Sequence, residues 1–190
     1  MVEVIYDGGL GNKLFQYCIG RILASELGFR LKAEPIVGFP KTFENVNGRD
    51  YSQNTTPITY TGQLIDLDYL LRTKPQQKII LNGYFQRYEY YSKYKDLIRD
   101  DWLVQDLVID EKISENDLVV AIRRGDYVPR HTLPMSYYEE AISKINCKNI
   151  YICTDSPHDP FIKYFRRKYS AIIRPMNALD NFAFIKFAFI

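Results

Sequence analysis

The chain has 190 residues, of which 46% are hydrophobic and 25% are charged, a balance typical of a soluble globular protein that can bury a core. Its formal net charge of +2 gives no reason to expect nucleic acid or a membrane surface as a partner. The sequence contains neither a signal peptide nor an apolar run long enough to span a bilayer, so a cytoplasmic location is expected, with three reduced cysteines, Cys18, Cys147 and Cys153.

The N-terminal segment predicts a strand, a glycine-rich turn, a helix and a second strand. Val2–Tyr6 is a short apolar run, and Lys13–Leu27 carries apolar residues at helical spacing before a stop signal at Gly28. Phe29–Ala33 then alternates like a strand. A strand, a helix and a strand in this order favour a parallel sheet in an α/β fold.

The middle of the chain has a different composition. Glu34–Gln77 is rich in Pro, Asn, Thr, Gly and Gln and predicts a long irregular insertion, with a short helix around Leu64–Leu71. A strand is expected again at Ile79–Leu81, followed by a polar, tyrosine-rich helix at Tyr88–Ile98.

A second α/β half is predicted after an acidic hinge at Asp106–Asp117. Its expected strands and helices alternate, at Leu118–Ile122, Ser136–Ile145, Asn149–Cys153, Asp159–Tyr169 and Ala171–Arg174, with a last helix from about Leu179. Ser136 followed by Glu139 predicts a capping box at the start of the first of these helices. The predicted domains are residues 1–110 and 111–190.

The last residues, Phe182–Ile190, would be apolar on nearly every side of a helix, so such a helix must be covered. Because the sequence stops there, we expect that the second half is incomplete and that the chain is truncated. The alternative is that this run packs on a partner subunit.

The most informative motif is Arg123-Arg124-Gly125-Asp126, which follows a buried strand directly. Ligands of open α/β sheets bind at the carboxyl ends of the strands, and two guanidiniums there suit a diphosphate. We expect an arginine pair without internal neutralisation, which favours a phosphorylated ligand. The alternative is a solvated charged turn with internal salt bridges.

Three weaker motifs accompany it. Gly8–Asn12 follows a strand and precedes a helix, a position that suits either the binding of an anion or a tight turn. The third glycine of the dinucleotide-binding motif would fall at position 14, which is Leu14. Thr154-Asp155 ends a strand, where the aspartate either accepts from a ribose hydroxyl or base N–H, or caps the next helix. Gly83–Gln86 is either a wall of a sugar site or a turn with core residues.

Taken in order, these motifs resemble those of the α-1,2-fucosyltransferases. Gly8 to Tyr17 reads Gly-Gly-Leu-Gly-Asn-Lys-Leu-Phe-Gln-Tyr and is similar to the opening signature of the family, and Ala121–Val128 resembles its His-x-Arg-Arg-Gly-Asp-Tyr-Val motif. Further similar segments are Gly83–Gln86, Tyr137-Tyr138 with Ala141-Ile142, and Tyr151–Asp155. Their order and rough spacing agree across essentially the whole chain.

The resemblance implies a GT-B-like fold, with two Rossmann-like halves facing a cleft. It implies inverting, metal-independent transfer of L-fucose from GDP-fucose, with no other cofactor, to a galactoside hydroxyl of a glycan acceptor in an α-1,2 linkage. Arg123 would hold the diphosphate and stabilise the leaving GDP, while Asp126 would be the base or would orient Arg123. The remaining implied contacts are Arg124, Thr154, Asp155, Gly11 and Asn12 for the donor, and Gln86 and Tyr127 for the acceptor.

The sequence departs from the family pattern at Ala121, Lys13 and Ser156, where the family has His, Gln and Asp. The Ser-Phe-Ser-Trp-Trp segment of the family would lie beyond Ile190. The alternative function is therefore a non-catalytic module that binds a sugar nucleotide or a glycan. A nicotinamide oxidoreductase is disfavoured by the incomplete dinucleotide motif.

Overall fold

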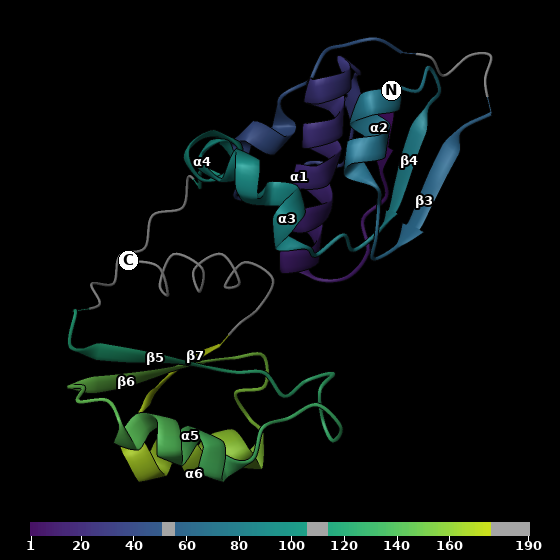
Figure 1. Ribbon diagram of the computed structural model, residues 1–190. Helices are drawn as coiled ribbons and strands as arrows, with labels where there is room; N and C mark the ends of the chain where they lie inside the picture. The colour runs from purple at the N-terminus through teal and green to yellow at the C-terminus, as the bar shows by residue number, and fades with distance from the viewer. Residues whose placement is uncertain (51–55, 106–113, 176–190) are drawn as a thin grey trace. The chain divides into compact units, whose positions relative to one another are not determined.

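The computed structural model describes residues 1–50, 56–105 and 114–175. The chain forms two compact units, Met1–Asp106 and Leu107–Ile190, and each is a mixed α/β unit built on a parallel sheet (Figure 1). The final predicted helix, the run Phe182–Ile190 and most of the predicted hinge lie outside the described residues.

The first unit begins with strand β1 (Val2–Val4), helix α1 (Leu10–Leu27) and strand β2 (Leu31–Lys32), as predicted. The remaining elements are η1 (Pro40–Phe43), β3 (Ile58–Gly62), α2 (Leu67–Thr73), β4 (Ile79–Gly83), α3 (Tyr88–Tyr91), η2 (Ser92–Tyr94), α4 (Lys95–Leu97) and the π-helical turn η3 (Ile98–Trp102). Helix α1 ends at Gly28, the predicted stop, and its buried face covers the sheet (Figure 1).

The strands of the first unit are all parallel and follow the order β2-β1-β4-β3. Val2 lies opposite both Leu31 and Ile79, so β1 is an inner strand with a partner on each side. Val2, Ile79 and Leu81 of the sheet and Ile19, Ile22 and Leu23 of α1 are all buried, and α1 contacts both β1 and β4. Burial on this scale contributes about 1.5–3 kcal/mol for each large aliphatic side chain.

Three predictions for the first unit were incomplete. The segment expected to be irregular contains β3, because half-buried Ile58 and Tyr60 alternate with exposed threonines and pair with β4. Helix α1 begins three residues earlier than expected, so Gly11 and Asn12 belong to its first turn. The helix expected at Tyr88–Ile98 is broken into short α, 3-10 and π segments.

The second unit has the predicted alternation of strands and helices. Its elements are β5 (Asp117–Ile122), α5 (Met135–Ser143), β6 (Asn149–Thr154), α6 (Pro160–Tyr169) and β7 (Ile172–Pro175). The strands are parallel in the order β5-β6-β7, and α5 and α6 lie together on one face (Figure 1). Ile122, Ile152, Ile162 and Phe165 form the buried core between this face and the helices.

The predicted capping box of α5 is wrong. The helix begins at Met135 after Pro134, and no side chain caps it. Ser136 therefore lies inside the first turn, where its hydroxyl is not at the cap position. The cysteine prediction is confirmed, since Cys18, Cys147 and Cys153 are all free and Cys18 and Cys153 are buried.

Candidate functional site

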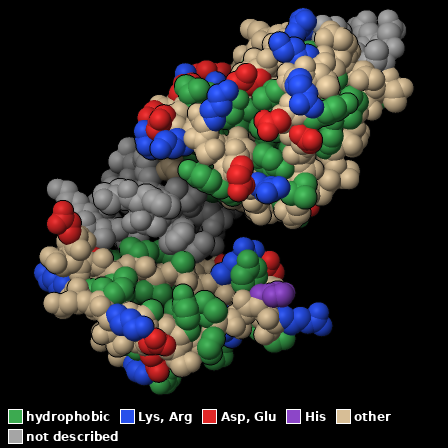
Figure 2. All heavy atoms as spheres, viewed as in Figure 1, with side chains coloured by type: hydrophobic (Ala, Val, Ile, Leu, Met, Phe, Trp, Pro, Cys, Tyr) green, Lys and Arg blue, Asp and Glu red, His purple; other side chains and the backbone are tan. Residues whose placement is uncertain are grey.

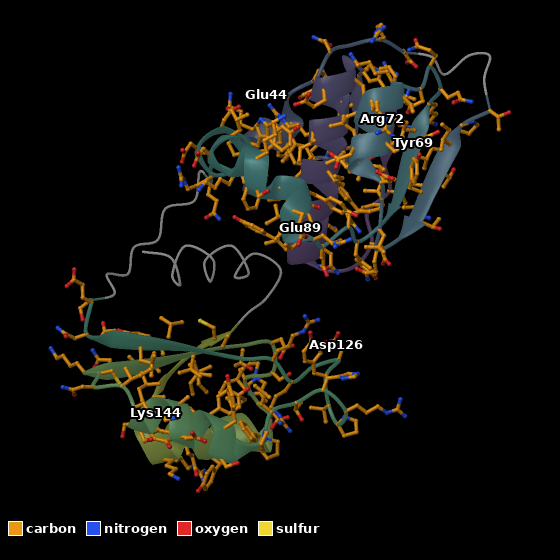
Figure 3. The ribbon with its side chains drawn as sticks, in the orientation of Figure 1. Glu44, Tyr69, Arg72, Glu89, Asp126 and Lys144 are labelled. Atoms are coloured by element: carbon orange, nitrogen blue, oxygen red, sulfur yellow. The ribbon has the colours of Figure 1, made fainter. Side chains whose placement is uncertain are left out.

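The loop after β5 places Arg123 and Asp126 in solvent. The Arg123 guanidinium donates from Nε to Asp126 Oδ1 at 3.1 Å and from Nη2 to Asp126 Oδ2 at 2.9 Å, and it lies 4.3 Å from the centre of the Tyr127 ring. Figure 3 labels Asp126 on this loop, and Figure 2 shows basic and acidic side chains gathered at this end of the unit. The side chains of Arg123 and Asp126 are 54% and 67% exposed, so a ligand can reach the pair.

The neighbouring Arg124 has a different environment. Its Nε lies 2.8 Å from Asp159 Oδ2, its guanidinium lies 4.6 Å from the centre of the Phe161 ring, and its side chain is 17% exposed. The prediction of an unneutralised arginine pair is therefore wrong, because each guanidinium has its own carboxylate. The two arginines do not act as one fork: Arg123 faces solvent and Arg124 packs on α6.

Asp155 links the ends of two neighbouring strands. Its Oδ1 accepts hydrogen bonds from the backbone N–H groups of Arg124 at 2.9 Å and Gly125 at 3.1 Å, and from the Ser156 hydroxyl at 3.1 Å. Partial burial opposes ionisation, but these hydrogen bonds prevail and lower the pKa of Asp155. Asp155 therefore fixes the shape of the loop that carries Arg123.

The predicted alternative for Asp155, a cap of the next helix, is wrong. That cap is Asp159, whose side chain accepts from the N–H of Phe161 at 2.7 Å. Asp159 is thus a site residue that we did not predict, although Asp followed by Pro160 is a recognisable helix start. Thr154 is fully buried, and its hydroxyl accepts from the N–H of Ser156 at 3.1 Å.

The predicted residues of the first unit form a separate group at the ends of β1 and β4. Gln86 Nε2 donates to Asn12 Oδ1 at 2.7 Å, while Gly11 is exposed in the first turn of α1. This group also contains Asp7 and Tyr84, joined by a 2.7 Å hydrogen bond, which we did not predict. Tyr84 follows β4 directly and Asp7 follows the predicted strand Val2–Tyr6, and that position is the signal that could have identified them.

Within residues 1–50, 56–105 and 114–175, no cluster of three or more histidine, cysteine, aspartate or glutamate side chains could hold a metal ion. None of the helices in this described part is long and apolar enough to cross a membrane. Comparisons of the chain with protein-family models, with curated proteins and with solved structures give no match.

Proposed function

We propose that this chain is an inverting glycosyltransferase that transfers L-fucose from GDP-fucose to a galactoside hydroxyl, with its two α/β units arranged as in GT-B enzymes. The ordered set of motifs supports this reading. The single observation that carries it is the exposed Arg123 guanidinium at the carboxyl end of a parallel strand, on a loop fixed by Asp155. This is the position at which α/β sheets bind phosphorylated ligands.

In the proposed reaction, negative charge develops on the diphosphate as GDP leaves. The fixed positive charge of Arg123 stabilises that charge in the transition state more than in the ground state. Arg124 and Asp155 act through the loop: Arg124 anchors it to α6 and Asp155 ties it to β6. Asp126 either orients Arg123, as its ion pair favours, or accepts the proton of the acceptor hydroxyl once a diphosphate has taken its place.

The experiment is a transfer assay with GDP-fucose and lactose, accompanied by calorimetric titration with GDP. Arg123→Ala removes charge-assisted hydrogen bonds worth about 1.5–3 kcal/mol, so GDP affinity should fall about 10- to 150-fold and turnover should be lost. Arg130→Ala, which removes an equally charged exposed side chain from the same loop, is the matched control. Near-normal turnover in the Arg123 variant would overturn the proposal.

The second candidate is a non-catalytic module that binds a sugar nucleotide or glycan. Two observations favour it: both arginines are already paired with carboxylates, and Ala121 on β5 offers no titratable group. GDP binding that depends on Arg123, without transfer of fucose to any galactoside tested, would select this second function.

A further inference from the structure

The strand order of the first unit defines a second candidate site. From β1 the chain passes through α1 to β2 on one side, whereas β4 lies on the other side of β1. The order of the strands therefore reverses between β1 and β4. In open α/β sheets, ligands bind outside the carboxyl ends of the strands at such a switch point.

The polar side chains at this switch point join the segments after the two strands. The Tyr84 hydroxyl donates to Asp7 Oδ2 at 2.7 Å, and Gln86 donates to Asn12 at 2.7 Å. Each bond therefore connects the segment after β1 with the segment after β4. The bond to Asp7 also raises the pKa of the Tyr84 phenol.

Asp7 is held in place from its backbone as well. Its N–H donates to Gln16 Oε1 at 3.2 Å, and Gln16 Nε2 donates back to its carbonyl at 3.3 Å, with Gln16 fully buried. The carboxylate is exposed, and within the described part of the chain Oδ1 has no hydrogen-bond partner. One oxygen is thus fixed by Tyr84 and the other faces solvent.

The backbone around these side chains is in unusual conformations. Gly8 has φ +78°, and a Cβ built there would collide with the amide of Asn12. Phe85 has φ +51° although it is not glycine, and the Tyr91 hydroxyl holds its carbonyl at 2.7 Å. Such strained backbone conformations persist only where the surrounding structure enforces them, and they are common at ligand-binding sites.

We infer that this strand-end cluster binds a neutral sugar, with Asp7 accepting from one or two adjacent hydroxyls and Gln86 contacting the rest. Asn12, which the resemblance assigns to the donor, is bonded to Gln86 and contacts this sugar instead. A carboxylate with one free oxygen attracts hydroxyl donors and repels a phosphate or another carboxylate. Carboxamides both donate and accept, as sugar hydroxyls do. The inference rests on the proposed function, in which this sugar is the acceptor, and it makes Asp7 its anchoring residue.

The test uses the full chain and titrates it with lactose, following backbone amide shifts by NMR. Shifts should appear at Asp7, Gly8, Asn12 and Gln86. Asp7→Asn keeps the shape of the side chain but loses a charged acceptor, so lactose affinity should fall about tenfold or more. Tyr84→Phe frees the carboxylate to rotate and should weaken binding by a smaller factor.

The matched control is Asp68→Asn, which makes the same charge change on α2 at an exposed residue that forms no ion pair with the other described residues. It should bind lactose as the unaltered chain does. Lactose affinity that is equal in the Asp7 and Asp68 variants would overturn the inference, as would amide shifts elsewhere. Inorganic phosphate that shifts the same amides would also overturn it, because the site would then be an anion site.

A parallel titration with GDP separates this inference from the proposed function. Asp7→Asn should leave GDP affinity unchanged, because the diphosphate is assigned to Arg123. Lactose binding that depends on Asp7, in a chain that does not bind GDP, would refute the proposed donor and retain the sugar site. GDP binding with no Asp7-dependent lactose binding would refute only the sugar site.

Discussion

Replacing Asp126 by asparagine should tighten the binding of GDP, although it removes a residue from the proposed site. In the free protein, Asp126 accepts hydrogen bonds from Nε and Nη2 of Arg123, at 3.1 and 2.9 Å, along an edge of the guanidinium that a diphosphate would use. An ion pair as exposed as this one is worth about 0.2–1 kcal/mol, and a diphosphate must displace it. The asparagine variant no longer makes this pair, so the ligand would not have to break it.

A second contribution comes from charge repulsion between Asp126 and the ligand. At about 7 Å in water, two like charges repel by about 0.6 kcal/mol, and salt reduces this value. Together the two effects are worth about 1 kcal/mol, so GDP affinity should rise about two- to tenfold. Transfer should fall at the same time if Asp126 is also the base.

Calorimetric titration with GDP at fixed ionic strength measures this effect, with Glu140→Gln as the control. Glu140 forms an ion pair of similar exposure with Lys144, at 2.6 Å on α5, away from the loop (Figure 3 labels Lys144). The control should bind GDP as the unaltered chain does. Weaker or unchanged GDP binding in the Asp126 variant would refute the argument that Asp126 occupies the place of the diphosphate.

Three further predictions concern stability and reactivity. Arg124→Ala should lower the free energy of unfolding, measured by urea denaturation, by about 1–3 kcal/mol, because it leaves Asp159 without its ion pair in a partly buried site. A loss below about 0.5 kcal/mol, the level of an ordinary surface substitution, would contradict this prediction. The pKa of Asp155 is lower in the folded chain than in the unfolded one, so the stability that Asp155 contributes is present above about pH 4 and is lost as the pH falls further. In acid unfolding titrations, Asp155→Asn should therefore reduce the loss of stability below about pH 4. A stability profile that is the same in the variant as in the unaltered chain would refute the role given to Asp155. A thiol reagent should modify the partly exposed Cys147 first, because burial raises the pKa of Cys18 to about 12 and of Cys153 to about 11; equal rates for all three in the native chain would contradict this.

The sequence allowed the strands and main helices to be predicted wherever the apolar pattern was strong. Helix α1 and strands β5 and β6 each carry enough apolar residues to show their period. Strand β3 could not be recognised, since Ile58–Gly62 is short and half exposed and is stabilised by its pairing with β4. Its threonines and tyrosine do not by themselves distinguish a half-exposed strand from a loop.

The candidate loop could be recognised in the sequence, but the pairing of its charged side chains could not. A strand followed by Arg123 and Arg124 can be recognised in the sequence. Which carboxylate pairs with which arginine depends on distances across the sheet, which the sequence does not show. Asp159 lies 35 positions after Arg124 and reaches it only because β5 and β6 are neighbours in parallel register. In the same way, Asp7 and Tyr84 are far apart along the chain and meet only beyond the carboxyl ends of β1 and β4.

The hydrogen bonds that two loop amides donate to Asp155 have a consequence for motion as well as for shape. Because Asp155 follows β6 directly, the loop after β5 can open only if it leaves the end of the adjacent strand. The amide hydrogens of Arg124 and Gly125 should therefore exchange with solvent as slowly as those of the β5–β6 ladder, unlike those of an ordinary surface loop. The arginine that would meet the ligand is thus on a segment whose order is set by the sheet.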